Sequence, residues 1–155
     1  MKLRADKSTL IIGCGNPHRR DDGVGGYIIA QLKSKLKKGS KIKTLGVHQL
    51  DLGLAEEIKN CDRVIFVDAT VERHEKGWKL AKLVPEEREL NFSHYLTPSS
   101  LLRLVEAIYQ KKPIGCVFSI SGCNFDFGPT LSPEVQQAAD KVVGEILRLV
   151  RPQGA

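Results

Sequence analysis

The sequence lacks the long apolar runs and the cysteine patterns that mark several large protein classes. No stretch approaches the roughly 18 to 20 apolar residues that a membrane-spanning helix needs, and the N-terminus has no apolar signal-peptide core with a cleavage site. The four cysteines form neither a CxxC pair nor a zinc-finger spacing, so we expect reduced thiols in or near the core and no structural disulfide. These absences predict a cytoplasmic protein with no membrane partner.

Aromatic residues are also scarce where the positive charge is concentrated. The formal net charge is +6, and much of the excess lies in the lysine-rich segment 33–43, which contains no ring that could stack on a base. These lysines fall at the end of an expected helix and in the loop after it, where cations are favourable and keep a surface soluble. We therefore expect no nucleic-acid partner, and interpret the segment as a solvated face that could also help to dock an acidic protein.

What the chain does contain is an alternation of strand and helix patterns. Short runs of apolar and β-branched residues predict five strands, at residues 8–13, 42–47, 63–68, 78–84 and 114–120. The unbroken apolar run in the third favours a central strand that is covered on both faces, as in parallel sheets. Lysines in the fourth favour an edge position.

Segments with the periodicity of amphipathic helices lie between these strands and after the last one. The first expected helix starts after Asp21, its N-cap, and closes at Gly39, and residues 52–59 predict a short second helix. The pairs Thr97–Pro98 and Ser132–Pro133 each place a capping residue before a proline, which predicts the starts of two more helices.

The alternation of strands and helices is typical of the α/β class. It predicts a single domain, residues 1–155, built on a mostly parallel twisted sheet of about five strands sandwiched by helices. Each helix should bury an apolar face against the sheet. For the helix that begins at Pro98, the residues expected to be buried are Leu101, Leu104, Val105 and Ile108.

Ligands of open α/β sheets bind beyond the carboxyl ends of the strands, so the polar residues that follow the strands are the candidates for a site. Asp22 follows the first strand, and Asp68 ends the third. His48 and Gln49 end the second strand and should line the same cleft if that strand is parallel. His94 stands downstream of the fourth, just before a helix. Two carboxylates and one or two imidazoles are therefore expected at one edge of the sheet.

The glycine-containing loop after the first strand does not match a nucleotide-binding motif. A GxGxxG motif starting at Gly13 would need glycine where His18 stands, and no GK[ST] follows. Asp21 and Asp22 at the start of the helix would also repel a pyrophosphate. One of the two can cap the helix while the other points elsewhere, and we assign the cap to Asp21.

The candidate residues instead have the composition of a metal site. A carboxylate such as Asp68 at the end of an apolar strand is costly unless it is paired, hydrogen-bonded or bound to a cation. With Asp22 and His94 it forms a set of oxygen and nitrogen ligands that suits a catalytic metal site with an open position. Taken alone, His94 is equally consistent with a structural loop histidine. No GxSxG motif is present, and no feature marks Cys14 as an activated thiol.

Four segments, in this order, resemble the nickel–iron hydrogenase maturation endopeptidases. They are Gly13 to Gly25 (GCGNPHRRDDGVG), Val67-Asp68-Ala69, His94 to Pro98 (HYLTP) and Gly128 to Val135 (GPTLSPEV). The resemblance extends over nearly the whole chain. It implies a sheet sandwiched by helices, with a cleft in which Asp22, Asp68 and His94 bind metal.

The resemblance also implies an activity. Such a protein removes the C-terminal extension of a hydrogenase large-subunit precursor after nickel has been inserted. The nickel is presented by the substrate, and no tightly bound intrinsic metal is expected. Asp22 and Asp68 would then be catalytic, with a carboxylate activating water while the metal polarises the scissile carbonyl, and His48 and Gln49 would contact the substrate. Two alternatives stay open: a metallohydrolase with its own ion, and a non-catalytic nickel-binding maturation factor.

Overall fold

A five-stranded, mostly parallel sheet forms the centre of the computed structural model, which describes residues 7–84 and 96–151. Its strands are β1 (Thr9–Cys14), β2 (Ile42–Val47), β3 (Arg63–Thr70), β4 (Trp78–Lys82) and β5 (Ile114–Ser121). Their order across the sheet is β2–β1–β3–β5–β4, and every neighbouring pair is parallel apart from β4 with β5. The predicted fold class is confirmed, including the central position of β3 and the edge position of β4.

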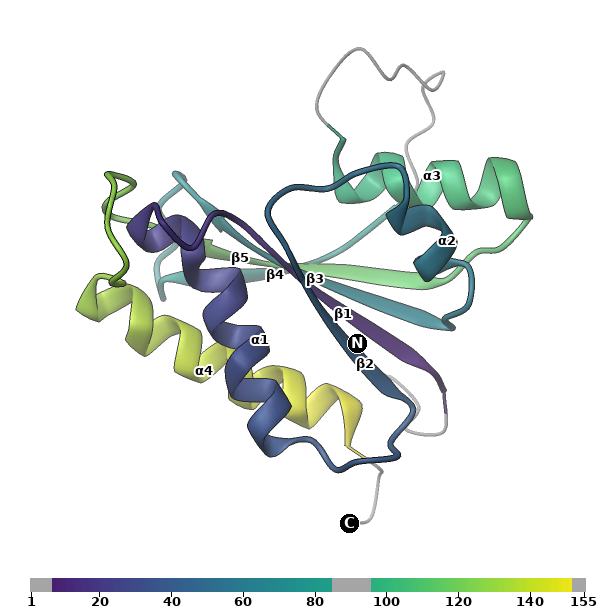
Figure 1. The fold of residues 1–155 in the computed structure, drawn as a ribbon, viewed down its shortest axis with the longest axis horizontal. Coiled ribbons are helices and arrows are strands. Elements are labelled where there is room, and N and C mark those ends of the chain that lie inside the picture. The colour runs from purple at the N-terminus through teal and green to yellow at the C-terminus, as the bar shows by residue number, and fades with distance from the viewer. Residues whose placement is uncertain (1–6, 85–95, 152–155) are drawn as a thin grey trace.

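Helices cover both faces of this sheet. On one face lie α1 (Val24–Lys35) and α4 (Pro133–Val150), and on the other lie α2 (Leu54–Ile58) and α3 (Pro98–Tyr109) (Figure 1). The side chains of β3 alternate between the two apolar layers, because successive strand residues point to opposite faces. Ile65 and Val67 pack in the layer of α1 and α4, whereas Val64 and Phe66 pack in the layer of α2 and α3.

The register of the parallel strands brings their carboxyl ends to one edge. Cys14 pairs with Val47, Gly13 with Val67, and Asp68 with Ser119. The helix α3 leads into the amino end of β5, so its own N-terminal end points toward this carboxyl edge (Figure 1). Residues that follow or end β1, β2 and β3 are therefore neighbours in space, although they are far apart in the chain.

The helix starts predicted at Thr97–Pro98 and Ser132–Pro133 are confirmed by α3 and α4, whereas the predicted cap of α1 is wrong. Thr97 caps α3 through a complete capping box with Ser100. The N-cap of α1, however, is Gly23, and a short 3₁₀ helix, η1 (Arg20–Gly23), precedes it, so the assignment of this cap to Asp21 is wrong. Ser132 does occupy the N-cap position of α4, but its side chain makes no capping hydrogen bond. The side chains of Asp21 and Ser132 instead take part in a tertiary contact, which is described below.

Two expectations about the helix faces and ends also fail. Ile108 is 54% exposed rather than buried, because it lies in the last turn of α3, where Tyr109 packs against the apolar layer instead. The helix α1 ends at Lys35, before Gly39, because Leu36 already adopts an extended conformation. The lysines of segment 33–43 are exposed, as expected for a solvated face.

Candidate active site

Asp22 and Asp68 are close enough at the carboxyl edge of the sheet for their charges to interact. Asp68 continues the alternation of Val64 and Phe66, which places it on the α2–α3 face. Burial, together with a smaller effect of the negative charge of Asp22, raises the pKa of the Asp68 carboxyl to about 6. One oxygen of Asp68 accepts a hydrogen bond from the Ala69 amide at 2.8 Å. A half-buried carboxylate that titrates near neutral pH can take up a proton from water.

Glycines hold the Asp22 segment against β1. Gly15 has a φ of +140°, and a Cβ atom at this position would collide with the backbone carbonyl of Asp22. A Cβ on Gly25 would lie 2.6 Å from the Cys14 backbone nitrogen, so the first turn of α1 also packs directly on β1. The Asn16 amide donates a hydrogen bond of 2.8 Å to the Asp22 carboxylate. The glycines of this loop thus allow the backbone to pack closely around the Asp22 carboxylate.

Cys14 lies beside both carboxylates. Burial raises the pKa of its thiol to about 12, with further contributions from the charges of Asp68 and Asp22. Its Sγ atom is 3.8 Å from the backbone carbonyl oxygen of His48. At neutral pH this thiol is protonated, so it is not an activated nucleophile.

Asp21, the neighbour of Asp22, is fully buried and acts as a tertiary anchor. Its carboxylate accepts hydrogen bonds from the backbone amides of Cys123, Asn124 and Ser132 and from the Ser132 hydroxyl, at 2.7 to 2.8 Å. Burial alone would raise the pKa of Asp21, but these hydrogen bonds outweigh it and hold the pKa below its usual value. Asp21 thereby fastens the loop between β5 and α4 to the segment that carries Asp22.

The remaining predicted site residues are His48, Gln49 and His94, of which the structure describes the first two. His48 and Gln49 follow β2 at the same edge, and both are exposed. His94 lies outside the described residues. Leu96, two positions later, packs in the α2–α3 layer, on the face to which Asp68 points. Within residues 7–84 and 96–151 there is no group of three or more acidic, histidine or cysteine residues that could hold a metal ion. His94, the third predicted ligand, is not among these described residues.

Sequence reasoning missed Ser119 and the anchoring role of Asp21. Ser119 pairs with Asp68 across β3 and β5, and its position between Phe118 and Ile120 places it on the opposite face from these two core residues. Its only sequence signal is a polar residue inside an apolar strand. The contact between Asp21 and Ser132 leaves no local signal, because both residue types are also typical of helix caps.

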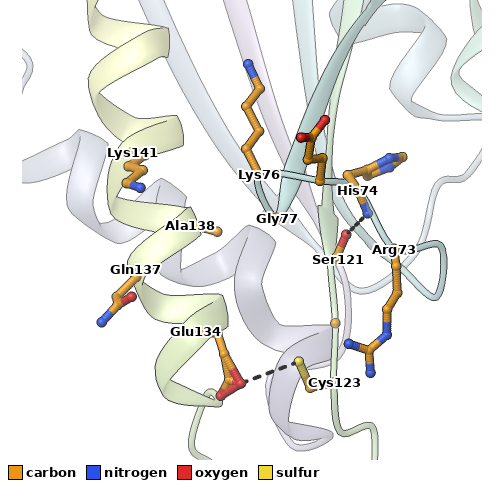
Figure 2. A pocket seen from close by; sticks show the side chains of 12 residues that line it. Arg73, His74, Lys76, Gly77, Ser121, Cys123, Glu134, Gln137, Ala138 and Lys141 are labelled. Atoms are coloured by element: carbon orange, nitrogen blue, oxygen red, sulfur yellow. Dashed lines mark hydrogen bonds between the residues drawn. The ribbon is translucent and has the colours of Figure 1, made fainter.

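A separate cavity of about 330 Å³ lies on the other side of the sheet, between the loop that precedes β4 and the first half of α4. Charged side chains of both signs line it, among them Arg73, Lys141 and Glu134. The Cys123 thiol points toward Glu134, with 3.9 Å between sulfur and oxygen (Figure 2). Neither Asp22 nor Asp68 contributes to this cavity, so it is not the candidate active site.

Comparison with known proteins finds similar sequences and similar structures. Two curated proteins of Methanocaldococcus jannaschii, both provisionally named hydrogenase maturation proteases, match nearly the whole chain. One is 27% identical over 161 residues, which cover 96% of this chain and 92% of the relative. The other is 29% identical over 153 residues, which cover 91% and 95%. This chain is therefore similar, over nearly its whole length, to proteins that carry this name. No family model matches the sequence.

Solved structures with these names share the fold. The [NiFe] hydrogenase maturation protease HycI from Thermococcus kodakarensis aligns with a TM-score of 0.75 and 20% identity over 93% of each chain. The hydrogenase maturating endopeptidase HybD from E. coli aligns with a TM-score of 0.72 and 19% identity over 98% of this chain and 94% of its own. The arrangement of helices and sheet is therefore that of the maturation proteases, as the resemblance of the sequence motifs predicted.

Proposed function

We propose that this protein is an endopeptidase that removes the C-terminal extension of a nickel-loaded hydrogenase large-subunit precursor. The observation that carries the proposal is the pair Asp22 and Asp68, held at the carboxyl edge of a fold shared with [NiFe] hydrogenase maturation proteases. The homology over almost the full length of the chain favours this activity over those of unrelated enzymes with the same architecture.

In the proposed reaction, Asp22, Asp68 and His94 contact the nickel that the precursor presents. The oxygen-rich set binds a metal held mainly by another protein without retaining it, because carboxylates are weak ligands for softer metals. A water molecule attacks the scissile carbonyl, which the metal polarises, and a carboxylate takes a proton from that water. The carbon–nitrogen bond then breaks, and the proton passes to the nitrogen of the extension, which leaves as an amine. Asp22 and Asp68 are the candidates for this base, since both carboxylates lie at the same edge of the sheet and interact with each other. His48 and Gln49 contact the substrate at the end of β2.

The proposed partner is the large-subunit precursor, and neither nucleic acid nor membrane is part of the proposal. In the part of the chain that the structure describes, no helix is long and apolar enough to cross a bilayer. We place the reaction in the cytoplasm, where thiols stay reduced, and all four cysteines of the chain are free.

Cleavage of a purified precursor tests the proposal. The protein is mixed with nickel-loaded and with nickel-free large subunit, and the loss of the extension is followed as a size shift on a gel. We expect cleavage of the nickel-loaded form and resistance of the nickel-free form. Cleavage of the nickel-free precursor at the full rate would refute the metal-dependent mechanism.

Two measurements distinguish the alternatives from the proposed function: the metal content of the purified protein, and its association with the precursor. A stoichiometric, tightly bound ion would favour a metallohydrolase with its own metal and a different substrate. Metal-dependent association with the precursor without any cleavage would favour a non-catalytic nickel-binding factor. The homologues support neither alternative, since they are named proteases.

A further inference from the structure

Several exposed apolar side chains lie in loops that follow the carboxyl ends of the strands. In the part of the chain that the structure describes, six large apolar side chains are exposed, and three of them, Leu52, Val71 and Phe127, follow the carboxyl ends of β2, β3 and β5. Val71 and Phe127 are the most exposed, at 80% and 77%. Because exposed apolar side chains can contribute to an interaction surface, the most firmly held of them is a candidate for protein binding.

Phe127 differs from an ordinary exposed side chain in how firmly its loop is held. The Arg20 amide donates to the Gly128 carbonyl at 2.9 Å, and the Gly128 amide donates to the His18 carbonyl at 2.8 Å. These bonds join the Phe127 loop to the loop that follows β1. The Arg19 guanidinium lies 4.8 Å from the centre of the Phe127 ring, and its Nε donates to the Phe125 carbonyl at 3.3 Å. The ring is therefore supported on one face by Arg19, while most of its surface stays exposed.

The same loop is tied to the active-site segment through Asp21. The buried Asp21 carboxylate binds the amides of Cys123 and Asn124 at one end of the loop and Ser132 at the other. Asp22, the next residue, carries one of the two candidate catalytic carboxylates. The ring of Phe127 is thus fixed relative to Asp22 through a short, hydrogen-bonded path. A partner that binds Phe127 would be positioned relative to Asp22 as well.

We propose that Phe127, stacked on Arg19, is a docking anchor for the large-subunit precursor. This inference rests on the proposed function and specifies how its substrate is recognised. The ring protrudes from a loop and does not line the cavity next to α4, so it fits an apolar recess on a folded polypeptide rather than a small molecule enclosed by this protein. A pre-ordered aromatic ring next to arginine has the composition of an interface hot spot, and little side-chain freedom is lost when it binds.

Steady-state cleavage of nickel-loaded precursor by Phe127→Ala tests this role. We expect KM to rise about 10-fold or more while kcat changes less than about 2-fold, because the truncated side chain affects docking and not the reacting groups. Phe127→Trp should restore KM to within about 3-fold, since it keeps an aromatic ring over Arg19. Ile108→Ala is the matched control, because Ile108 is also an exposed apolar residue but lies on α3, and its KM should not change.

A direct binding measurement distinguishes a failure of the docking role from a failure of the proposed function. The affinity of wild-type protein and Phe127→Ala for the precursor is measured by calorimetry, and we expect the same loss as in KM. If wild-type protein cleaves the precursor and Phe127→Ala has an unchanged KM and affinity, the docking role is wrong and the proposed function stands. If wild-type protein neither binds nor cleaves the nickel-loaded precursor, both are wrong.

Discussion

Asp21 and Ser132 are separated by 111 positions in the sequence, yet the Asp21 carboxylate accepts hydrogen bonds from both the amide and the hydroxyl of Ser132. The contact joins the 3₁₀ helix before α1 to the start of α4. Together with the bonds to Cys123 and Asn124, it closes the loop that carries Phe127 onto the segment that carries Asp22. Two residues with the chemistry of helix caps therefore stabilise tertiary structure instead.

Replacing Asp21 by asparagine should destabilise the fold. The substitution removes a charge that four donors surround, and one hydrogen-bonding position of the side chain becomes a donor that faces other donors. We expect a loss of about 2 to 3 kcal/mol in the free energy of unfolding at pH 7, measured by urea denaturation. Asp126→Asn, an exposed change in the same loop, is the control and should have almost no effect.

The effect of Asp21→Asn should also depend on pH. The folded-state pKa of Asp21 lies below its unfolded value, so its ionised form stabilises the fold above the unfolded pKa of about 4, and this contribution is lost as the pH falls through the folded pKa. Wild type and variant should therefore converge in stability in acid. A difference that stays constant as the pH falls to about 2 would contradict the anchoring role of the carboxylate.

Asp22→Asn and Asp68→Asn should each abolish most of the cleavage. Both substitutions keep the side-chain size but remove the charge that attracts a metal ion and the capacity to accept a proton, which is commonly worth about 10² to 10⁴ in rate. The rate with nickel-loaded precursor measures the effect. Glu72→Gln, which removes an exposed carboxylate from the loop after β3, should be as active as wild type. Full activity in both aspartate variants would refute the site assignment.

Asp68→Asn should stabilise the metal-free protein at neutral pH. The folded-state pKa of Asp68 is raised to about 6, so ionisation destabilises the fold above that pH, and the penalty disappears as the pH falls toward the unfolded value of about 4. We expect a gain of about 2 to 3 kcal/mol at about pH 7.5, measured by urea denaturation, that shrinks to near zero at about pH 4. The side-chain oxygen of the introduced asparagine can still accept the hydrogen bond from the Ala69 amide, so an unstable variant would indicate a different role for this carboxylate.

Gly15→Ala should remove activity through the backbone. Its Cβ would collide with the Asp22 carbonyl in a conformation that alanine rarely adopts, so Asp22 must move or the fold must loosen. We expect a loss of cleavage of about 10-fold or more together with a lower melting temperature. Gly26→Ala is the matched control in the following helix, where a Cβ meets nothing within 4 Å, and it should be neutral or slightly stabilising. Equal behaviour of the two variants would contradict this account of Gly15.

His48→Ala should weaken cleavage by about 10- to 100-fold, the usual range for groups that support a metal site from its surroundings. The His48 backbone carbonyl lies against Cys14, so its side chain starts from the edge that carries both carboxylates, and it is exposed there. His74→Ala changes a histidine that lines the separate cavity and should leave the rate unchanged. Unchanged activity of His48→Ala would make His48 an ordinary surface residue.

The sequence alone was sufficient for the fold class and for the resemblance to the maturation proteases, which the curated relatives share. The pattern of β3, an apolar run closed by Asp68, predicted a central strand with a polar residue at its carboxyl end, and the strand lies where it was expected. Strand β2 spans the predicted residues 42–47, and Thr97 caps α3. These features succeed because side-chain periodicity and capping are local, and the carboxyl ends of parallel strands necessarily share an edge.

Only the tertiary structure decided what several polar and apolar side chains do. The sequence pattern predicts a cap at Asp21, but a buried carboxylate surrounded by amides gains more from four hydrogen bonds than from one helix terminus. Ile108 follows the apolar period of α3, but the helix end leaves it exposed. The raised pKa of Asp68 and the exposure of Phe127 above Arg19 likewise depend on neighbours that are distant in the chain. Periodicity carries information about the nearest turns of a helix or strand, whereas burial and charge depend on which segments meet in space.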